Sequence, residues 1–218
     1  GVLDAVECPP TFSSAPEMVQ GIIAGGYGAL VQSIEGAEDS REEGAKAVSD
    51  FSVNKNDVFL GISASSNTPF VLGALEEAHK TGASTGLLVC NHPPKISYID
   101  YIISIITGPE VITGSTRMKA GTATKMALNM ITTTAMIKMN KTYGNLMVDL
   151  KASNVKLCDR GTRIIQQITD LSYDEAFTLL KSADREVKTA LVMNKRGVSK
   201  LEAQGLLQEV SGQLVKVI

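Results

Sequence analysis

The strongest constraint on the fold is an apolar run at 57–62 that is followed by a hydroxyl-rich loop, a helical pattern at 70–80 and a second apolar run at 85–90. Neither apolar run alternates with polar residues, which is typical of strands buried on both faces of a parallel sheet. The spacing between the runs fits a right-handed parallel crossover. With a third strand expected at 99–107, the pattern predicts a three-layer α/β unit, in which helices sandwich a mainly parallel sheet.

Composition and charge narrow the classes of function. The 218 residues are 44% apolar and 20% charged, which is typical of a globular protein with enough material for a core. The formal net charge is −2, and acidic and basic residues are interspersed along the chain. No basic stripe is present, so we expect neither a nucleic-acid partner nor binding to a membrane surface.

The cysteines are distributed as expected for reduced thiols. Cys8, Cys90 and Cys158 are odd in number, lie far apart and occur in apolar or helical contexts. This pattern favours a cytosolic protein with no disulfide framework and no metal site. The longest apolar stretches, at 101–106 and 126–139, are too short or too interrupted to span a bilayer.

Helical patterns precede the expected sheet. One helix is expected to start at Pro16, and a second is expected from Tyr27 towards Ser33. A third helix is expected to be capped by Ser40 and to end near Asn54.

A long helix at 118–140 and a group of shorter helices follow the sheet. The long helix is apolar all round, so we expect it to be central, with its methionines filling the core. These methionines are Met118, Met126, Met130, Met136 and Met139. Capping-box patterns at 172–175 and 199–202 predict short helices further on. We therefore expect an α/β domain at 1–165 and a small helical bundle at 166–218.

The loop after the first apolar run is a candidate anion site. It carries the polar side chains Ser63, Ser65, Ser66, Asn67 and Thr68 just before a helix begins. Hydroxyls and backbone N–H groups at the positive end of a helix dipole suit phosphate. The alternative is that these residues form only a cap and a turn. Because four hydroxyls in six residues exceed what one cap needs, we favour the phosphate site.

A second candidate loop leads from the third expected strand into the long helix. It contains Ser115, Thr116, Arg117 and Lys119 among glycines, and it is locally basic although the chain is net acidic. We expect it to face an anion. The alternative is that its hydroxyls and cations only pack or solvate the surface.

Five segments give the sequence a family resemblance. They are Glu7-Cys-Pro-Pro-Thr-Phe12, Ile23-Ala-Gly-Gly26, Glu38-Asp-Ser40, the block 108–129, and Tyr143-Gly-Asn-Leu-Met-Val-Asp-Leu150. Together they closely resemble the N-acetylmuramic acid 6-phosphate etherase family, which shares its ancestry with glucokinase regulatory protein. The resemblance covers most of the chain up to about residue 163.

The resemblance implies a fold and an activity. The fold would be the doubly wound sugar isomerase (SIS) domain, followed by a small bundle similar to ubiquitin-associated modules. The activity would be that of a carbon–oxygen lyase, which releases D-lactate from N-acetylmuramic acid 6-phosphate during recycling of cell-wall sugar. The enzyme would be a cytoplasmic homodimer that acts on a phosphorylated amino sugar without a metal or organic cofactor.

The same resemblance implies two catalytic carboxyl groups. Glu7 matches the family's proton donor, and Glu38 matches its second acid/base. Elimination needs a positioned base and a positioned acid, and two carboxyls suffice. Without the resemblance, Glu7 would be the end of a helix before two prolines and Glu38 a solvated acid.

The chain departs from the family pattern in two places. In the family, a strand and a Gly-x-Gly-Thr-Ser-Gly loop precede the sequence that starts here at Gly1, so we expect that strand and that first phosphate loop to be missing. The family also has Ser-Gly-Arg-Thr-Pro where this chain has Ser65-Ser-Asn-Thr-Pro69. Loss of glycine and of a bidentate cation is expected to alter ligand affinity or identity.

Two other functions remain open from the sequence. A phosphosugar-sensing regulatory protein would bind without turnover, and an aldose–ketose isomerase would interconvert sugars without losing lactate. Retention of Glu7 and Glu38 argues against the first, and the block 108–129 argues against the second.

Overall fold

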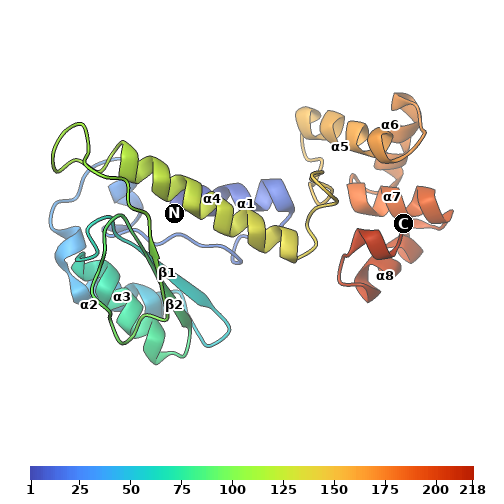
Figure 1. Cartoon of the computed structure of the whole chain (residues 1–218). Coiled ribbons are helices and arrows are strands. Elements are labelled where there is room, and N and C mark those ends of the chain that lie inside the picture. The colour runs from blue at the N-terminus through green and yellow to red at the C-terminus, as the bar shows by residue number, and fades with distance from the viewer. The chain divides into compact units, whose positions relative to one another are not determined.

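The computed structural model describes residues 1–218, which form two compact units. The first unit comprises residues 1–2 and 21–129, and the second comprises residues 3–20 and 130–218. Figure 1 labels the α-helices and the first two strands.

The first unit is built on a parallel sheet of three strands in the order β1-β2-β3. The strands are β1 (Val58–Ile62), β2 (Ser84–Val89) and β3 (Tyr101–Ser104). The predicted parallel strands are therefore confirmed, although β3 is shorter than the range expected for it. Only the central strand β2 is buried along most of its length, whereas the expectation that every strand is buried on both faces is wrong at the edges. Val58 of β1 and Tyr101 of β3, for example, are exposed.

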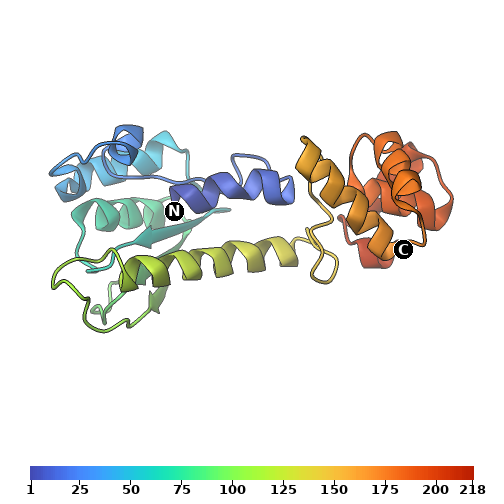
Figure 2. The same ribbon diagram turned by 90° about the horizontal axis from the view of Figure 1, so that it is seen from above.

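Helices cover both faces of this sheet, as expected for a doubly wound fold. Leu87 and Val89 of β2 pack against Leu75 of α3 (Pro69–Lys80) on one face. On the other face, Leu88 packs against Ala127 and Leu128 of α4 (Lys119–Lys138). Successive residues of a strand point to opposite faces, so one short strand anchors a helix on each side. Figures 1 and 2 show α3 and α4 on the two sides of the sheet.

A second helix, α2 (Arg41–Asp50), packs closely on α3. A Cβ atom on Gly44 would lie 2.0 Å from the carbonyl oxygen of Phe70, and one on Gly73 would lie 2.2 Å from that of Arg41. Only glycine fits at these two positions, which lets the helix backbones approach. The predicted cap is confirmed, because the Ser40 hydroxyl accepts a hydrogen bond from the Glu43 N–H at 3.2 Å. The helix ends at Asp50, a few residues before the expected end.

The segments that lead into α2 differ from the prediction. A helix α1 (Val2–Phe12) continues through Pro9 and Pro10, so Glu7 lies within the helix and not at its end. The helix expected from Pro16 is wrong, because Pro16 starts only a turn closed by the Met18 N–H and the Ala15 carbonyl. Apolar spacing in this stretch reflects an extended chain.

Short 3-10 helices replace the second expected helix of this region. They are η1 (Gly26–Leu30) and η2 (Ala37–Asp39), and each follows a glycine in the left-handed conformation. Glycine adopts this conformation without steric cost, which explains the turns before both elements.

The second unit ends in the expected helical bundle. Its helices are α5 (Val155–Ile168), α6 (Tyr173–Ser182), α7 (Val187–Arg196) and α8 (Lys200–Glu209), and the 3-10 helix η3 (Leu214–Lys216) follows. Ile165, Leu180, Leu191 and Leu214 are fully or almost fully buried in one core. Both predicted capping boxes are confirmed, with Ser172 paired to Glu175 and Ser199 paired to Glu202.

Most of the methionines in and beside α4 do not fill a core. Met136 is 1% exposed, as predicted, but Met118, Met126, Met130 and Met139 are between 44% and 65% exposed. The prediction is wrong for these four because a helix that is apolar all round does not reveal how many of its faces have neighbours. No helix of the chain is both long and apolar enough to cross a membrane.

Candidate functional site

The hydroxyl-rich loop lies where β1 ends and α3 begins, at the carboxyl edge of the sheet. The Ser63 N–H donates to the Leu88 carbonyl at 3.0 Å, which continues the β1–β2 pairing into the loop. The Ser63 and Thr68 hydroxyls lie 2.8 Å apart, and those of Ser63 and Ser65 lie 3.4 Å apart. The structure thus brings together the predicted loop residues at the place where open α/β sheets bind ligands.

The N-terminus of α3 has no side-chain cap. Thr68 occupies the N-cap position but makes no cap hydrogen bond, since its hydroxyl pairs with Ser63. Pro69 occupies the first turn and has no N–H group of its own. The remaining first-turn N–H groups therefore point outward without a side-chain acceptor, at the positive end of the helix dipole. This arrangement suits an anion.

Ser66 shows why the family pattern has glycine in this loop. Its φ angle is 66°, in the left-handed region, and its side chain is only 4% exposed. The Ser66 N–H donates to the Ser63 carbonyl at 3.2 Å and closes a turn. A non-glycine residue is strained in this conformation.

Cys90 and Asn91, which the sequence did not assign to the candidate site, support the loop from the end of β2. The Cys90 N–H donates to the Ala64 carbonyl at 3.2 Å, and the Asn91 side-chain amide donates to the Ser65 carbonyl at 2.8 Å. The Cys90 sulfur lies 3.9 Å from the Ala120 carbonyl oxygen at the start of α4. Both residues directly follow the end of a parallel strand, and that position is the signal that could have identified them.

The second candidate loop is arranged differently. Ser115, Thr116 and Arg117 precede α4, Lys119 is the first residue of the helix, and Ser115 alone of the four is partly buried. The helix N-terminus is already occupied by a carboxylate of the protein itself, which belongs to Glu110.

Glu110 closes α4 with both of its carboxylate oxygens. They accept hydrogen bonds from the N–H groups of Lys119 at 3.1 Å and Ala120 at 3.0 Å. These two backbone donors lower the pKa of the Glu110 carboxyl. The Lys119 ammonium donates to the Pro109 carbonyl at 2.7 Å. A ligand at this loop would therefore meet hydroxyls and Arg117 and not an open helix end.

The two candidate catalytic glutamates lie in different units. Glu38 is exposed in η2, which packs against α3 within the first unit. Glu7 is exposed on α1 in the second unit, next to Cys8, which is 3% exposed. Burial raises the pKa of the Cys8 thiol, and the carboxylates of Asp4 and Glu7 raise it further. Cys8 is thus a packing residue with a protonated thiol, whereas Glu7 faces solvent.

The first unit contains a cavity of about 430 Å³ beside the turn that carries Glu38. Its lining includes Gly25, Gly26, Ala37, Ser40 and Phe70. Ala37 and Ser40 flank the Glu38-Asp39 pair, so the turn forms one border of the cavity.

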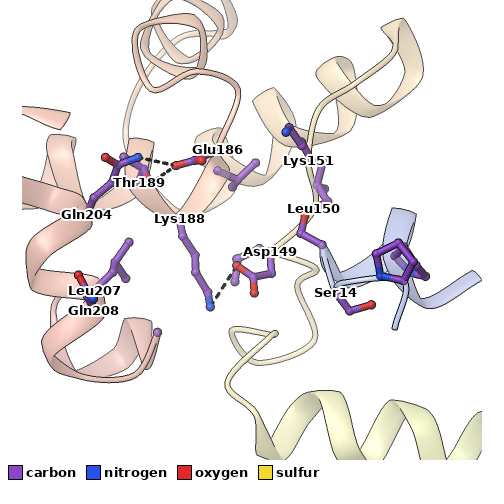
Figure 3. A pocket seen from close by; sticks show the side chains of 16 residues that line it. Ser14, Asp149, Leu150, Lys151, Glu186, Lys188, Thr189, Gln204, Leu207 and Gln208 are labelled. Atoms are coloured by element: carbon purple, nitrogen blue, oxygen red, sulfur yellow. Dashed lines mark hydrogen bonds and ion pairs between the residues drawn. The ribbon is translucent and has the colours of Figure 1, made fainter. Parts of the chain in front are cut away.

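The second unit contains a larger cavity of about 690 Å³, which Figure 3 shows. Asp149 pairs there with Lys188 at 3.2 Å and with Lys141 at 2.8 Å. Burial lowers the pKa of the Lys188 ammonium, and Asp149 opposes that shift. Glu186 is likewise occupied, since it accepts hydrogen bonds from the Thr189 hydroxyl and the Gln204 amide.

Asp149, Lys188 and Glu186 thus have partners within the protein, and the Lys151 ammonium is the one charged group of the lining without an ion pair or a side-chain hydrogen bond. Only the Ser14 hydroxyl is buried there without a partner. Nowhere in the chain are three or more His, Cys, Asp or Glu side chains grouped so that they could hold a metal ion.

Comparisons with known proteins agree with this architecture. Residues 2–79 match the N-terminal SIS domain of glucokinase regulatory protein, and residues 144–201 match its C-terminal lid domain. The parallel sheet, the loop before α3 and these two matches define a SIS-domain protein with a C-terminal lid.

Full-length relatives identify the family. A Bacillus subtilis protein named N-acetylmuramic acid 6-phosphate etherase is 51% identical over 100% of this chain, which covers 72% of that relative. Proteins of the same name from Microcystis aeruginosa and a Picosynechococcus species are 50% and 49% identical over 98% of the chain, which covers 70% and 71% of them. The chain belongs to the N-acetylmuramic acid 6-phosphate etherase family, which confirms the resemblance drawn from its motifs.

Proposed function

We propose that this protein is a carbon–oxygen lyase that cleaves the lactyl ether of N-acetylmuramic acid 6-phosphate to give N-acetylglucosamine 6-phosphate and D-lactate. The observation that carries the proposal is the identity of about half of all residues, along the whole chain, with proteins that bear this activity in their name.

The loop before α3 would hold the phosphate. Phosphate would accept hydrogen bonds from the open first-turn N–H groups of α3 and from the side chains of Ser65 and Asn67, which are exposed. Ser63, Ser66 and Thr68 would shape the loop, because they are mostly buried and bond within it. Ser115, Thr116, Arg117 and Lys119 would contact the sugar or its phosphate from the other loop.

The proposed chemistry is an elimination followed by a hydration. With the sugar ring open, the C1 aldehyde acidifies the proton on C2, and a carboxylate removes it while the C2–C3 double bond forms and the C3–O bond breaks. A carboxylic acid protonates the departing lactate oxygen. Water then adds its hydroxyl to C3 and returns a proton to C2, so no oxidant or further reactant is needed.

Glu7 and Glu38 would perform these proton transfers, with Glu7 as the proton donor and Glu38 as the second acid/base. Both carboxyls face solvent and neither makes a side-chain hydrogen bond. They are therefore open to a substrate. The protein would act as a cytoplasmic homodimer in the recycling of cell-wall sugar.

A second candidate function is a non-catalytic sensor of phosphosugars. Both domain matches carry the name of glucokinase regulatory protein, and the phosphate loop lacks the family's glycine and arginine. Such a protein would bind the phosphosugar without turnover.

The test is D-lactate release from N-acetylmuramic acid 6-phosphate by the natural full-length protein. We expect release, and we expect Glu7→Gln and Glu38→Gln each to lower kcat on the order of 100-fold or more while phosphosugar binding persists. Binding without lactate release by the unmodified protein would favour the sensor. Undiminished turnover in both variants would refute the catalytic assignment.

A further inference from the structure

Asn91 links the end of β2 to the candidate phosphate loop. Its side-chain amide nitrogen donates to the Ser65 carbonyl at 2.8 Å and lies 3.3 Å from the Ser66 hydroxyl oxygen. Two backbone hydrogen bonds fix the position of the backbone just before Asn91. The Ser63 N–H donates to the Leu88 carbonyl, and the Cys90 N–H donates to the Ala64 carbonyl. The amide therefore reaches the loop from a rigid extension of the sheet.

The orientation of the Asn91 amide follows from its partners. A carbonyl oxygen such as that of Ser65 only accepts hydrogen bonds, so the atom that faces it must be the amide nitrogen. The other amide atom, Oδ1, is consequently the one that is buried without a hydrogen-bond partner. A flipped amide would place two acceptors against each other.

The unpartnered oxygen makes asparagine a poor choice for stability alone. A buried acceptor without a partner costs about 1–3 kcal/mol, as much as the two amide hydrogen bonds contribute together. The net stability that the Asn91 amide contributes to the loop is therefore small, and its main effect is on the shape of the loop.

We propose that Asn91 is a positioning residue of the phosphate site, which acts through Ser65 and Ser66. By holding the Ser65 carbonyl and the Ser66 hydroxyl, its amide keeps Ser66 in the left-handed conformation, with φ at 66°. That conformation sets the direction of the N–H groups that follow it, up to the open end of α3. The inference rests on the proposed function, because the group to be positioned is the substrate phosphate.

The experiment compares Asn91→Ala with the unmodified natural full-length protein. A loop displaced by about 1 Å weakens binding strongly, so we expect KM for N-acetylmuramic acid 6-phosphate to rise about tenfold or more, while kcat changes less than about threefold. The dissociation constant of inorganic phosphate, measured by calorimetry, should rise in parallel.

The thermal midpoint of unfolding should change little. Asn91→Ala removes two hydrogen bonds but also removes the buried oxygen that has no partner, and these two effects offset each other. Asn194→Ala on α7, an exposed asparagine, is the matched control.

A double variant separates positioning from a general loss of structure. Glycine adopts the left-handed conformation without help from a neighbouring side chain. We therefore expect the double variant, Ser66→Gly with Asn91→Ala, to bind the phosphosugar almost as tightly as Ser66→Gly alone. An unchanged KM in Asn91→Ala, or a raised KM that Ser66→Gly does not rescue, would overturn the inference. Failure of the proposed function looks different: the unmodified protein would release no lactate, and the phosphate measurements would still decide the role of Asn91.

Discussion

Two helices of the second unit, α6 and α8, and one helix of the first unit, α3, have opposite arrangements at their N-termini. In the second unit, Ser172 and Ser199 each accept the hydrogen bond of a first-turn N–H, and Glu175 and Glu202 bond back to the capping residue. In the first unit, Thr68 stands at the same position before α3 but bonds to Ser63. The same type of side chain thus closes two helices and leaves one open, depending on where its hydroxyl is directed.

This difference distinguishes helix N-termini that stabilise the fold from helix N-termini that can bind an anion. A closed end gains about 1 kcal/mol of stability and has one N–H donor fewer for a ligand. An open end gives up that stability and offers its N–H groups and its dipole to an anion. The N-terminus of α4 is also closed, because the Glu110 carboxylate accepts hydrogen bonds from the Lys119 and Ala120 N–H groups.

The largest expected effect comes from closing the open end. In Thr68→Asp, a carboxylate at the N-cap would satisfy the first-turn N–H groups and repel phosphate, so we expect the KM for the phosphosugar to rise on the order of 100-fold. The thermal midpoint should stay level or rise, since aspartate is a good cap. Thr68→Asn caps without charge and should raise KM much less. Equal KM values in the aspartate variant and the unmodified protein would show that the phosphate lies elsewhere.

A smaller effect is expected from opening a closed end. Ser172→Ala removes the capping box of α6 and should lower the free energy of unfolding by about 1 kcal/mol in urea titrations. Lactate release per folded molecule should not change, because the cap touches no candidate site residue. A loss of activity larger than the loss of folded protein would contradict the separation between the two kinds of end.

The strained serine provides a finer test. Ser66→Gly should stabilise the chain by up to about 1 kcal/mol, because glycine relieves the left-handed strain but gains entropy in the unfolded state. Urea unfolding of Ser66→Gly and Ser66→Ala measures this, with alanine expected to be the less stable of the two. The reverse order would contradict the strain assigned to position 66, because both variants lack the hydroxyl and differ only in the Cβ atom and the backbone freedom of glycine.

How well the sequence predicts a feature depends on how far apart the interacting residues lie along the chain. The capping boxes at Ser172 and Ser199 were predicted because all of their atoms lie within four residues. The strand, loop and helix around Ser63 were predicted because a buried parallel strand has a distinct pattern. Burial was predicted wrongly for four of the five methionines in and beside α4, since the pattern of one helix does not reveal which of its faces are covered.

The interactions around the candidate site were missed for a related reason. Asn91 reaches Ser66 from 25 residues further along the chain, and Glu110 lies nine residues before Lys119 at the start of α4. Both depend on where the folded chain returns, which local patterns do not encode. The roles of Glu7 and Glu38 came only from the family resemblance.

The smallest expected effect concerns the pH dependence of the closed end of α4. The Lys119 and Ala120 N–H groups lower the pKa of Glu110 in the folded chain, so its contribution to stability is present above the ordinary carboxyl pKa. It is lost as the pH falls through the lowered folded-state pKa. Urea unfolding from about pH 7 to about pH 3 should show a shallower acid decline in Glu110→Gln than in the unmodified protein. Superimposable acid profiles would contradict the role of Glu110 as the cap.

The most direct test of the account is the fate of the ether bond in isotopically labelled water. The natural full-length protein is incubated with N-acetylmuramic acid 6-phosphate in ¹⁸O-labelled water or in D₂O, and both products are analysed by mass spectrometry. Elimination followed by hydration predicts ¹⁸O at C3 of the sugar and none in the ether-derived oxygen of lactate, with deuterium at C2. Label in the lactate hydroxyl, or a product without deuterium at C2, would contradict cleavage by elimination and hydration.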